Sequence, residues 1–295
     1  MRTWNLGVFA AGAVSGVMLL TACGAGPQAT ASKPGKTEKS VAPSAKPSKD
    51  SESDVRKLDA DAGPPQHLEQ AAGGYEQSFS PAYDYDGNGC YATPAIGADG
   101  TLASGLGLGG AVNGHCRDLS DLQNSQTYAR SKADNGWVAV MYASYFEKDQ
   151  SSEGVGEIAG GTNGHRNDWE HVVTWINQST NQVEYVSVSQ HGKYKTYPRS
   201  EVQFEGTHPK VVYHKDGGFT HDFRIANTND EPPENHLGTW VFPPIVDWNG
   251  WPSAELRDKL MNASFGEANL DIRDSSFPSK LADAKPAEVP FNPAA

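Results

Sequence analysis

The sequence predicts a mostly β protein, an antiparallel β-sandwich with a few flanking helices. From about Tyr75 onward, aromatic residues and glycines become frequent, and short runs of β-branched and aromatic residues recur. Turn-forming residues separate these runs, and signals for helix starts are few. Many short strands with few helices are typical of two sheets packed face to face. The sequence shows no internal repeat and no second domain.

Five runs rich in Val, Ile, Tyr, Phe or Trp are expected to form strands: 137–146, 171–176, 182–189, 211–214 and 223–226. The polar stretch 177–181 is expected to join two of them as a hairpin loop. The Lys-Asp-Gly-Gly stretch 215–218 gives a second hairpin signal. Helix starts are expected at 120–122 and, after Pro252, at 253–260.

The first 22 residues have the pattern of a secretory signal. Arg2 precedes an uncharged apolar run that ends in Leu-Thr-Ala-Cys at Cys23. This ending resembles a bacterial lipoprotein box, in which cleavage leaves a lipid-modified Cys23; two acyl chains are enough for stable anchoring. We therefore expect an exported cell-envelope lipoprotein on the extracellular face, held by its own cell membrane. An uncleaved anchor, a plain signal peptide with a chance cysteine, and release of the mature protein are the alternatives.

Residues 24–72 contain no Phe, Trp or Tyr and are rich in Ala, Ser, Pro, Lys and Asp. Such a segment cannot bury enough apolar surface to offset the entropy lost on ordering. We expect the lipidated cysteine and a disordered tether to occupy residues 23–72. The folded domain is then expected to span 73–290.

The excess of acidic charge falls on that domain. The formal net charge is −12, whereas residues 24–72 carry seven basic and seven acidic residues and Arg2 is the only charge before them. A strongly acidic domain repels phosphate backbones, so nucleic acid is excluded as a partner. It favours cations or partners with amino groups, although acidity can also serve solubility alone.

Two cysteines remain once Cys23 is assigned to the lipid. An exported chain with only Cys90 and Cys116 left most simply forms one disulfide between them. Neither residue lies in a Cys-x-x-Cys motif, which argues against a metal-binding or catalytic thiol.

The stretch 164–170, Gly-His-Arg-Asn-Asp-Trp-Glu, is the most informative part of the chain. In an extended strand, Asp168 and Glu170 point to one face and Trp169 to the other. An oxygen-rich cluster of this kind suits Mg²⁺ or Ca²⁺ better than Zn²⁺. A buried tryptophan on a sandwich strand with a solvated acidic face is the structural alternative.

This stretch resembles the central heptapeptide of the necrosis- and ethylene-inducing-like proteins, the NLP cytolysins, which reads Gly-His-Arg-His-Asp-Trp-Glu. Six of the seven residues match, and Asn167 stands where the family has its second histidine. The resemblance covers roughly residues 75–287. Further family landmarks occur before and after it, in the same order as in the family: 89–90, 94–96, 99–100, 116, 128–131, 141–142, 145–150, 191–194, 208–214, 220–221, 266–269 and 277–284.

The resemblance implies a divalent cation, Mg²⁺ or Ca²⁺, in a negatively charged surface cavity. Asp168 becomes a direct ligand, and His165 and Glu170 become cavity residues that hold coordinated water. Asp149 becomes the second carboxylate ligand because its local context matches the family. Its distance from His165 along the chain is roughly twice the usual one, and Glu157 at the usual distance is the alternative.

Four further residues are expected at the cavity or in target binding: His191, His221, Arg166 and Asn167. For each histidine taken alone, a structural role is the competing interpretation. Arg166 is better suited to hold the loop by pairing with carboxylates than to contact a ligand. Asn167 hydrogen bonds but cannot carry a charge, which puts any contribution of the family's second histidine in doubt. The resemblance also implies a disulfide at Cys90 and Cys116.

By resemblance, the function is that of a monomeric, non-enzymatic cytolysin that binds glycosylated sphingolipid headgroups of plant plasma membranes and causes membrane damage and necrosis. A non-toxic glycan- or lipid-binding surface module on the same scaffold is the first alternative, and the lipid anchor favours it. A metal-dependent glycan hydrolase or lyase is the second. Here His165, Asp168 and Glu170 would serve as base and ligands. No His-Glu-x-x-His or Gly-x-Ser-x-Gly motif supports that second alternative.

Overall fold

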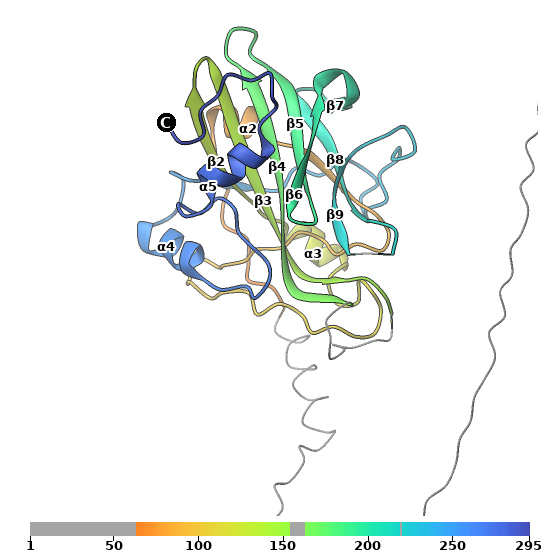
Figure 1. Ribbon diagram of the computed structural model, residues 1–295. Coiled ribbons are helices and arrows are strands. Elements are labelled where there is room, and N and C mark those ends of the chain that lie inside the picture. The colour runs from red at the N-terminus through yellow and green to blue at the C-terminus, as the bar shows by residue number, and fades with distance from the viewer. Residues whose placement is uncertain (1–62, 154–162, 219) are drawn as a thin grey trace, which may run out of the picture. The chain divides into compact units, whose positions relative to one another are not determined.

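Two β-sheets pack face to face in the computed structural model, which describes residues 63–153, 163–218 and 220–295 (Figure 1). The larger sheet has six strands in the spatial order β10 (Ile245–Asp247), β2 (Thr127–Asp134), β3 (Trp137–Gln150), β4 (Gly164–Asn177), β5 (Gln182–Gln190) and β6 (Lys193–Pro198). The smaller sheet has β8 (His208–Lys215) as its central strand. Three strands pair with it: β1 (Ala82–Tyr85), β7 (Phe204–Glu205) and β9 (His221–Ile225).

The mostly β sandwich predicted from the sequence is confirmed, and its central pairs are antiparallel. Two edge strands differ from that expectation. β1 pairs with β8 in parallel, and β10 pairs with β2 in parallel. A parallel pair needs a long crossover, and β1 and β10 each lie more than a hundred residues from their partners along the chain. Short-range turn signals therefore could not reveal these pairs.

The larger sheet is buried on both faces, so the molecule has two hydrophobic layers. Along β4, Val172 and Ile176 point into the layer between the sheets, whereas Trp169, Val173 and Trp175 point into the other layer. This alternation is the ordinary period of a strand. Two helices, α4 (Ala254–Asn262) and α5 (Phe277–Ala284), cover the outer layer, and Figure 1 shows α5 lying across the larger sheet.

The helix starts expected from the sequence are found. Helix α4 follows Ser253, whose hydroxyl oxygen accepts the Leu256 N–H at 3.1 Å. Helix α3 (Leu119–Gln123) begins with a capping box between Asp118 and Asp121. The remaining helical segments are α2 (Gly74–Ser78) and the 3-10 turn η1 (Arg199–Glu201).

The predicted disulfide is present between two loops that lie far apart in sequence. Cys90 and Cys116 are bonded, with their Cα atoms 5.0 Å apart, and both are buried in the layer between the sheets. In the chain-entropy picture, a cross-link of this span stabilises the fold by about 3–4 kcal/mol.

The tether was expected to extend to residue 72, and this boundary is wrong, because residues 65–72 pack on the domain. Leu68 is buried, and its N–H donates to the Gln126 side chain at 2.6 Å. The Ala71 N–H donates to the Ile245 carbonyl at 2.9 Å. The absence of aromatic residues predicted disorder here, but it gives no information on the backbone hydrogen bonds that Leu68 and Ala71 form with the domain. The signal peptide, Cys23 and the rest of the tether lie outside the described residues. Within the described ranges, no helix has the length and apolar character needed to cross a bilayer.

Candidate functional site

The candidate site lies at the end of β3 and β4 nearest the loop that joins them. Here Asp149 is directly opposite His165, and Phe146 is opposite Asp168. Gly164 permits this close pairing: its φ is +117°, and a Cβ there would lie 1.9 Å from the Asp149 carbonyl oxygen. No other residue fits at that position.

An unusual backbone conformation brings His165 and Asp168 together. The two are three residues apart, a spacing that places side chains on opposite faces of a regular strand. Between them, Asn167 has φ 60°, in the left-handed region that asparagine tolerates better than most residues. The His165 Nδ1 lies 2.7 Å from the Asn167 carbonyl oxygen. A carbonyl can only accept, so Nδ1 carries a proton and Nε2 of the neutral ring keeps its lone pair.

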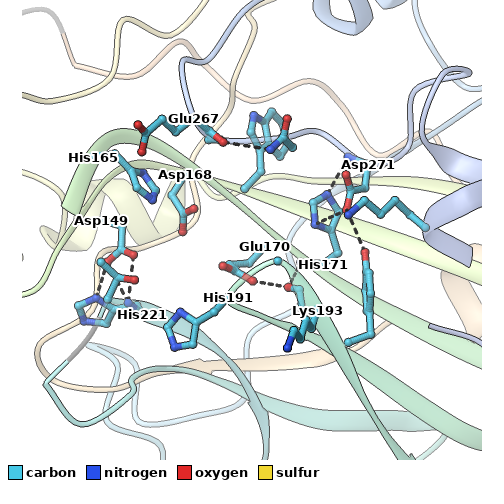
Figure 2. A pocket seen from close by; sticks show the side chains of 18 residues that line it. Asp149, His165, Asp168, Glu170, His171, His191, Lys193, His221, Glu267 and Asp271 are labelled. Atoms are coloured by element: carbon cyan, nitrogen blue, oxygen red, sulfur yellow. Dashed lines mark hydrogen bonds and ion pairs between the residues drawn. The ribbon is translucent and has the colours of Figure 1, made fainter. Parts of the chain in front are cut away.

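Three side chains converge into a group with metal-ligating atoms. One ligand atom from each of Asp149, His165 and Asp168 lies within 4.8 Å of the other two (Figure 2). Asp149 is held by His221, whose backbone N–H and ring Nδ1 lie 3.0 and 2.8 Å from the same carboxylate oxygen. The Tyr213 hydroxyl donates to Asp168 at 3.3 Å. Neighbours thus orient both carboxylates.

Burial leaves this group with uncompensated negative charge. Burial, together with the neighbouring Asp149 carboxylate, raises the pKa of Asp168 to about 7. Burial and Asp168 raise the pKa of Glu170 well above its ordinary value, although the Ser189 hydroxyl donates to it. Burial alone would lower the pKa of His165, but the Asp168 carboxylate and the Asn167 carbonyl outweigh it and leave that pKa raised. A bound cation would relieve the same repulsion.

The three residues line a cavity of about 270 Å³ that opens to solvent. Of the other residues predicted for the site, Glu170, His191 and His221 also line it (Figure 2). Asp149 and three residues of the heptapeptide, which were predicted from the sequence to form one site, thus line the same cavity. Its alternative, Glu157, lies outside the described residues.

Arg166 and Asn167 do not line the cavity, contrary to expectation. The Arg166 guanidinium donates to the carbonyl oxygens of Ser104 and Gly105 at 3.2 and 3.0 Å. The Asn167 side-chain oxygen accepts the Tyr145 hydroxyl at 2.6 Å. The left-handed conformation at Asn167 breaks the alternation along β4, so both side chains lie toward the loop at 104–105 and away from the cavity.

One wall of the cavity was missed by sequence reasoning. It is formed by residues from the middle of β4, from the start of β6, from the segment before α5 and from α5 itself: His171, Lys193, Tyr194, Glu267, Asp271 and Lys280. His171 is buried, and its Nε2 accepts the Asp271 N–H at 3.0 Å. Burial lowers the pKa of His171. The stretch 266–269 stood out as a family landmark, but no spacing in the sequence linked it to β4.

The fold and the site define a class of protein: a β-sandwich with a solvent-open cavity lined by buried carboxylates and histidines. The model of the necrosis-inducing protein (NPP1) family matches residues 74–284. The chain is 33% identical over 201 residues to NLP effector protein 10 of Phytophthora capsici, covering 67% of this chain and 77% of that one. It therefore belongs to the NPP1 family of necrosis-inducing toxins.

Solved structures agree on the fold. A structure described as NLPPya in complex with mannosamine has a TM-score of 0.62 and 28% identity, covering 77% of this chain and 97% of that one. Its glucosamine complex matches with a TM-score of 0.61, the same identity and the same coverage. A structure described as the non-toxic HaNLP3 protein matches with a TM-score of 0.63 and 26% identity, covering 76% of this chain and 99% of that one.

Proposed function

We propose that the protein is an exported, lipid-anchored cytolysin whose cavity binds glycosylated sphingolipid headgroups of plant plasma membranes through a divalent cation, Mg²⁺ or Ca²⁺. The observation that carries the proposal is the convergence of Asp149, His165 and Asp168, with ligand atoms within 4.8 Å of one another. It acts by binding and membrane damage, without enzymatic turnover.

The residues fit a hard cation. Two buried carboxylates supply oxygen ligands, which Mg²⁺ and Ca²⁺ prefer. His221 and Tyr213 fix the carboxylates of Asp149 and Asp168 in place, so the site is formed before the ion arrives. Mg²⁺ usually keeps several waters, and His165 and Glu170 are placed at the cavity to hold them. The ion supplies a positive centre for sugar hydroxyls beside the carboxylates of the cavity.

The chemistry of the cavity suits an amino sugar or a sugar headgroup. Carboxylates accept hydrogen bonds from hydroxyls and attract an ammonium group. Glu267 and Asp271 extend the acidic lining beyond the ion-binding residues. Complexes of a family member with mannosamine and with glucosamine support this assignment. Damage to the target membrane then starts from surface binding of a rigid domain.

A non-toxic binding module is the second candidate. A family member described as non-toxic has the same fold, so the fold alone does not separate the two functions. In this chain, Asn167 replaces the family's second histidine, and its side chain is engaged with Tyr145 behind the strand. A glycan hydrolase is less supported, because no His-Glu-x-x-His or Gly-x-Ser-x-Gly motif accompanies His165, Asp168 and Glu170.

Dye leakage from vesicles tests the proposal. The full-length protein, purified in mild detergent, is added to vesicles with and without plant glycosylated sphingolipid, in Mg²⁺, in Ca²⁺ or in chelator. We expect leakage that needs both the sphingolipid and the ion, and that Asp168→Asn abolishes it. Asp258→Asn, a change at an exposed carboxylate on α4, is the matched control and should leak normally.

Each other outcome has a definite meaning. Ion-dependent binding without leakage would establish the non-toxic module in place of the cytolysin. Leakage that is unaffected by chelator and by Asp168→Asn would overturn the role of the cavity.

A mass spectrum of the mature protein tests the anchor. We expect a chain that begins at Cys23 and carries the added mass of a lipid. An unmodified N-terminus would exclude the anchor without affecting the cavity.

A further inference from the structure

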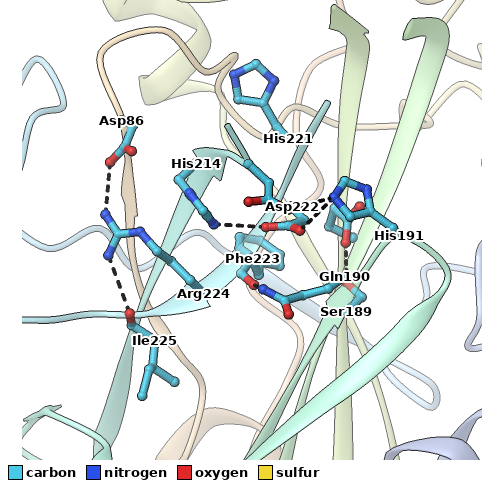
Figure 3. Close-up of polar contacts among 12 residues, drawn as sticks. Asp86, Ser189, Gln190, His191, His214, His221, Asp222, Phe223, Arg224 and Ile225 are labelled. Atoms are coloured by element: carbon cyan, nitrogen blue, oxygen red, sulfur yellow. Dashed lines mark hydrogen bonds and ion pairs between the residues drawn. The ribbon is translucent and has the colours of Figure 1, made fainter. Parts of the chain in front are cut away.

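A second group of side chains that could hold a metal ion lies on the other side of β9 from the group formed by Asp149, His165 and Asp168. One ligand atom from each of His191, Asp216 and Asp222 lies within 4.8 Å of the other two. Figure 3 shows the His191 ring beside the Asp222 carboxylate. His191 follows β5, Asp216 follows β8, and Asp222 lies on β9. Figure 3 shows His221 and Asp222 pointing to opposite sides of β9. His221 holds Asp149 of the first group, so one strand separates the two sites.

Asp222 is the residue that points to a missing ligand. Its side chain is 0% exposed, and within the described part of the chain neither carboxylate oxygen accepts a hydrogen bond. Buried carboxylates without donors are rare because burial removes their hydration. The carboxylate is aimed at ring nitrogens, with His191 Nε2 3.4 Å from Oδ2 and His214 Nε2 3.0 Å from Oδ1. These rings approach the oxygens closely, but their N–H directions are not aligned on them.

The separations match two ligands that share one metal ion. Around a tetrahedral ion with bonds of about 2.0–2.1 Å, neighbouring ligand atoms are about 3.3 Å apart. The His191 Nε2 lies 3.4 Å from Asp222 Oδ2 and 3.2 Å from Asp216 Oδ2. A metal ion sits to one side of the line that joins its two ligands, whereas a hydrogen bond lies along it. The misaligned pair at Asp222 is therefore better suited to an ion than to a proton.

His214 orients the group from behind. It is the cross-strand partner of Asp222 between β8 and β9, and its Nε2 lies beside the second carboxylate oxygen. With an ion bound at Oδ2, His214 is the neighbour that would fix the direction of the carboxylate through its other oxygen. On the other side, the side chains of His191 and Asp216 are 40% and 51% exposed, so an ion has a route in from solvent.

We propose that His191, Asp216 and Asp222 bind a transition-metal cation of the Zn²⁺ class, with His214 as a positioning residue. An imidazole nitrogen beside carboxylate oxygens suits Zn²⁺, and three protein ligands leave a coordination position open to water or to a polar ligand. The ion ties the turn after β5 to the β8–β9 hairpin. Because His191 also lines the cavity, this second ion stands at the cavity rim and fixes one of its walls.

Calorimetric titration with ZnCl₂ tests the site on full-length protein first stripped with chelator. The titration is done in the Asp168→Asn background, because Zn²⁺ can also occupy the first group. We expect one Zn²⁺ per chain there, loss of measurable binding on adding His191→Gln or Asp222→Asn, and affinity lowered about 10–100-fold on adding His214→Gln. Adding Asp258→Asn, at an exposed carboxylate on α4, should change nothing.

His191→Gln decides the outcome if Asp222→Asn does not fold, because the half-exposed His191 can be replaced without disturbing the core. Circular dichroism checks the fold of each variant. An anomalous difference map at the zinc absorption edge should place one peak between His191 and Asp222. No Zn²⁺ binding in the Asp168→Asn background, or binding unchanged by His191→Gln, would overturn the proposal.

Discussion

The two ends of the β3–β4 pair differ more in chemistry than in burial. At the far end, Val138–Val140 and Thr174–Ile176 are buried and mostly apolar. At the cavity end, Glu147–Gln150 are equally buried, yet all four are polar or charged. On β4, the buried carboxylates of Asp168 and Glu170 lie opposite Phe146 and Ser144, just before them. The same two strands therefore supply stability at one end and an acidic site at the other. Sites of function are where a sequence departs from the rules of core packing.

The cavity end is unfavourable to folding when it is ionised. Burial, followed by the nearby Asp121, raises the pKa of Glu147 to about 8, and one of its oxygens has no hydrogen bond within the described ranges. Burial lowers the pKa of Lys148 to about 8, although its ammonium group donates to the Ala111 carbonyl at 3.0 Å. The free-energy cost of burying these ionisable groups is offset by apolar packing elsewhere in the fold, including the far end of the same two strands.

The largest expected effect is at the far end. Trp175 is fully buried, and its indole N–H donates to Ser187 at 3.0 Å. We expect Trp175→Ala to lower the free energy of unfolding by about 3–5 kcal/mol in urea titrations while leaving ion affinity unchanged. Trp137→Ala, at a partly exposed position on β3, should lose less. A loss below about 1 kcal/mol for Trp175→Ala would mean that this end does not carry the stability.

Glu147→Gln separates the charge of the cavity end from its shape. The folded pKa of about 8 lies above the unfolded value, so the stabilising contribution of the neutral acid is complete below about pH 4.3 and is lost as pH rises through 8. We expect the variant to match the wild type at pH 4 and to exceed its unfolding free energy by about 2–4 kcal/mol at pH 8.5. Thermal unfolding across pH measures this. A difference that does not change with pH would rule out the buried ionisation.

Asp168→Asn should stabilise the ion-free protein. The amide keeps the shape of the side chain and removes the repulsion between Asp168 and Asp149. We expect the free energy of unfolding in chelator to rise by about 2 kcal/mol. Equal or lower stability than the wild type in chelator would contradict the picture of a strained acidic group.

The smallest effect concerns the backbone at Asn167, whose φ is 60°. Asn167→Gly and Asn167→Ala both remove the hydrogen bond from Tyr145, but only alanine opposes the left-handed conformation. We expect the alanine variant to be less stable than the glycine variant by about 1–2 kcal/mol in denaturant titrations. Equal stabilities would show that this conformation is not required.

The sequence was most informative where the signals were local. Period-two patterns and turn residues predicted the strands 171–176 and 182–189, and capping residues predicted α4. Local context also favoured Asp149 over Glu157 as a ligand, whereas distance along the chain alone favoured Glu157. The structure places Asp149 beside His165 and Asp168.

Long-range contacts could not be predicted from the sequence. The parallel pairing of β1 and β10 and the cavity wall at Glu267 and Asp271 join segments with no shared spacing. The orientation of the Arg166 and Asn167 side chains depends on the left-handed backbone conformation at Asn167. The regular alternation of a strand, from which the sequence prediction was made, does not contain such a residue. The pairing of His214 with Asp222 requires the register of β8 and β9.

The central claim is that Asp149 and Asp168, beside His165, bind one divalent cation in the cavity. Calorimetric titration of Mg²⁺ and Ca²⁺ into full-length wild type, Asp168→Asn and the control Asp258→Asn tests it most directly. We expect one ion per chain in the wild type and in Asp258→Asn, and no measurable binding in a folded Asp168→Asn. Unchanged affinity in Asp168→Asn would contradict the account.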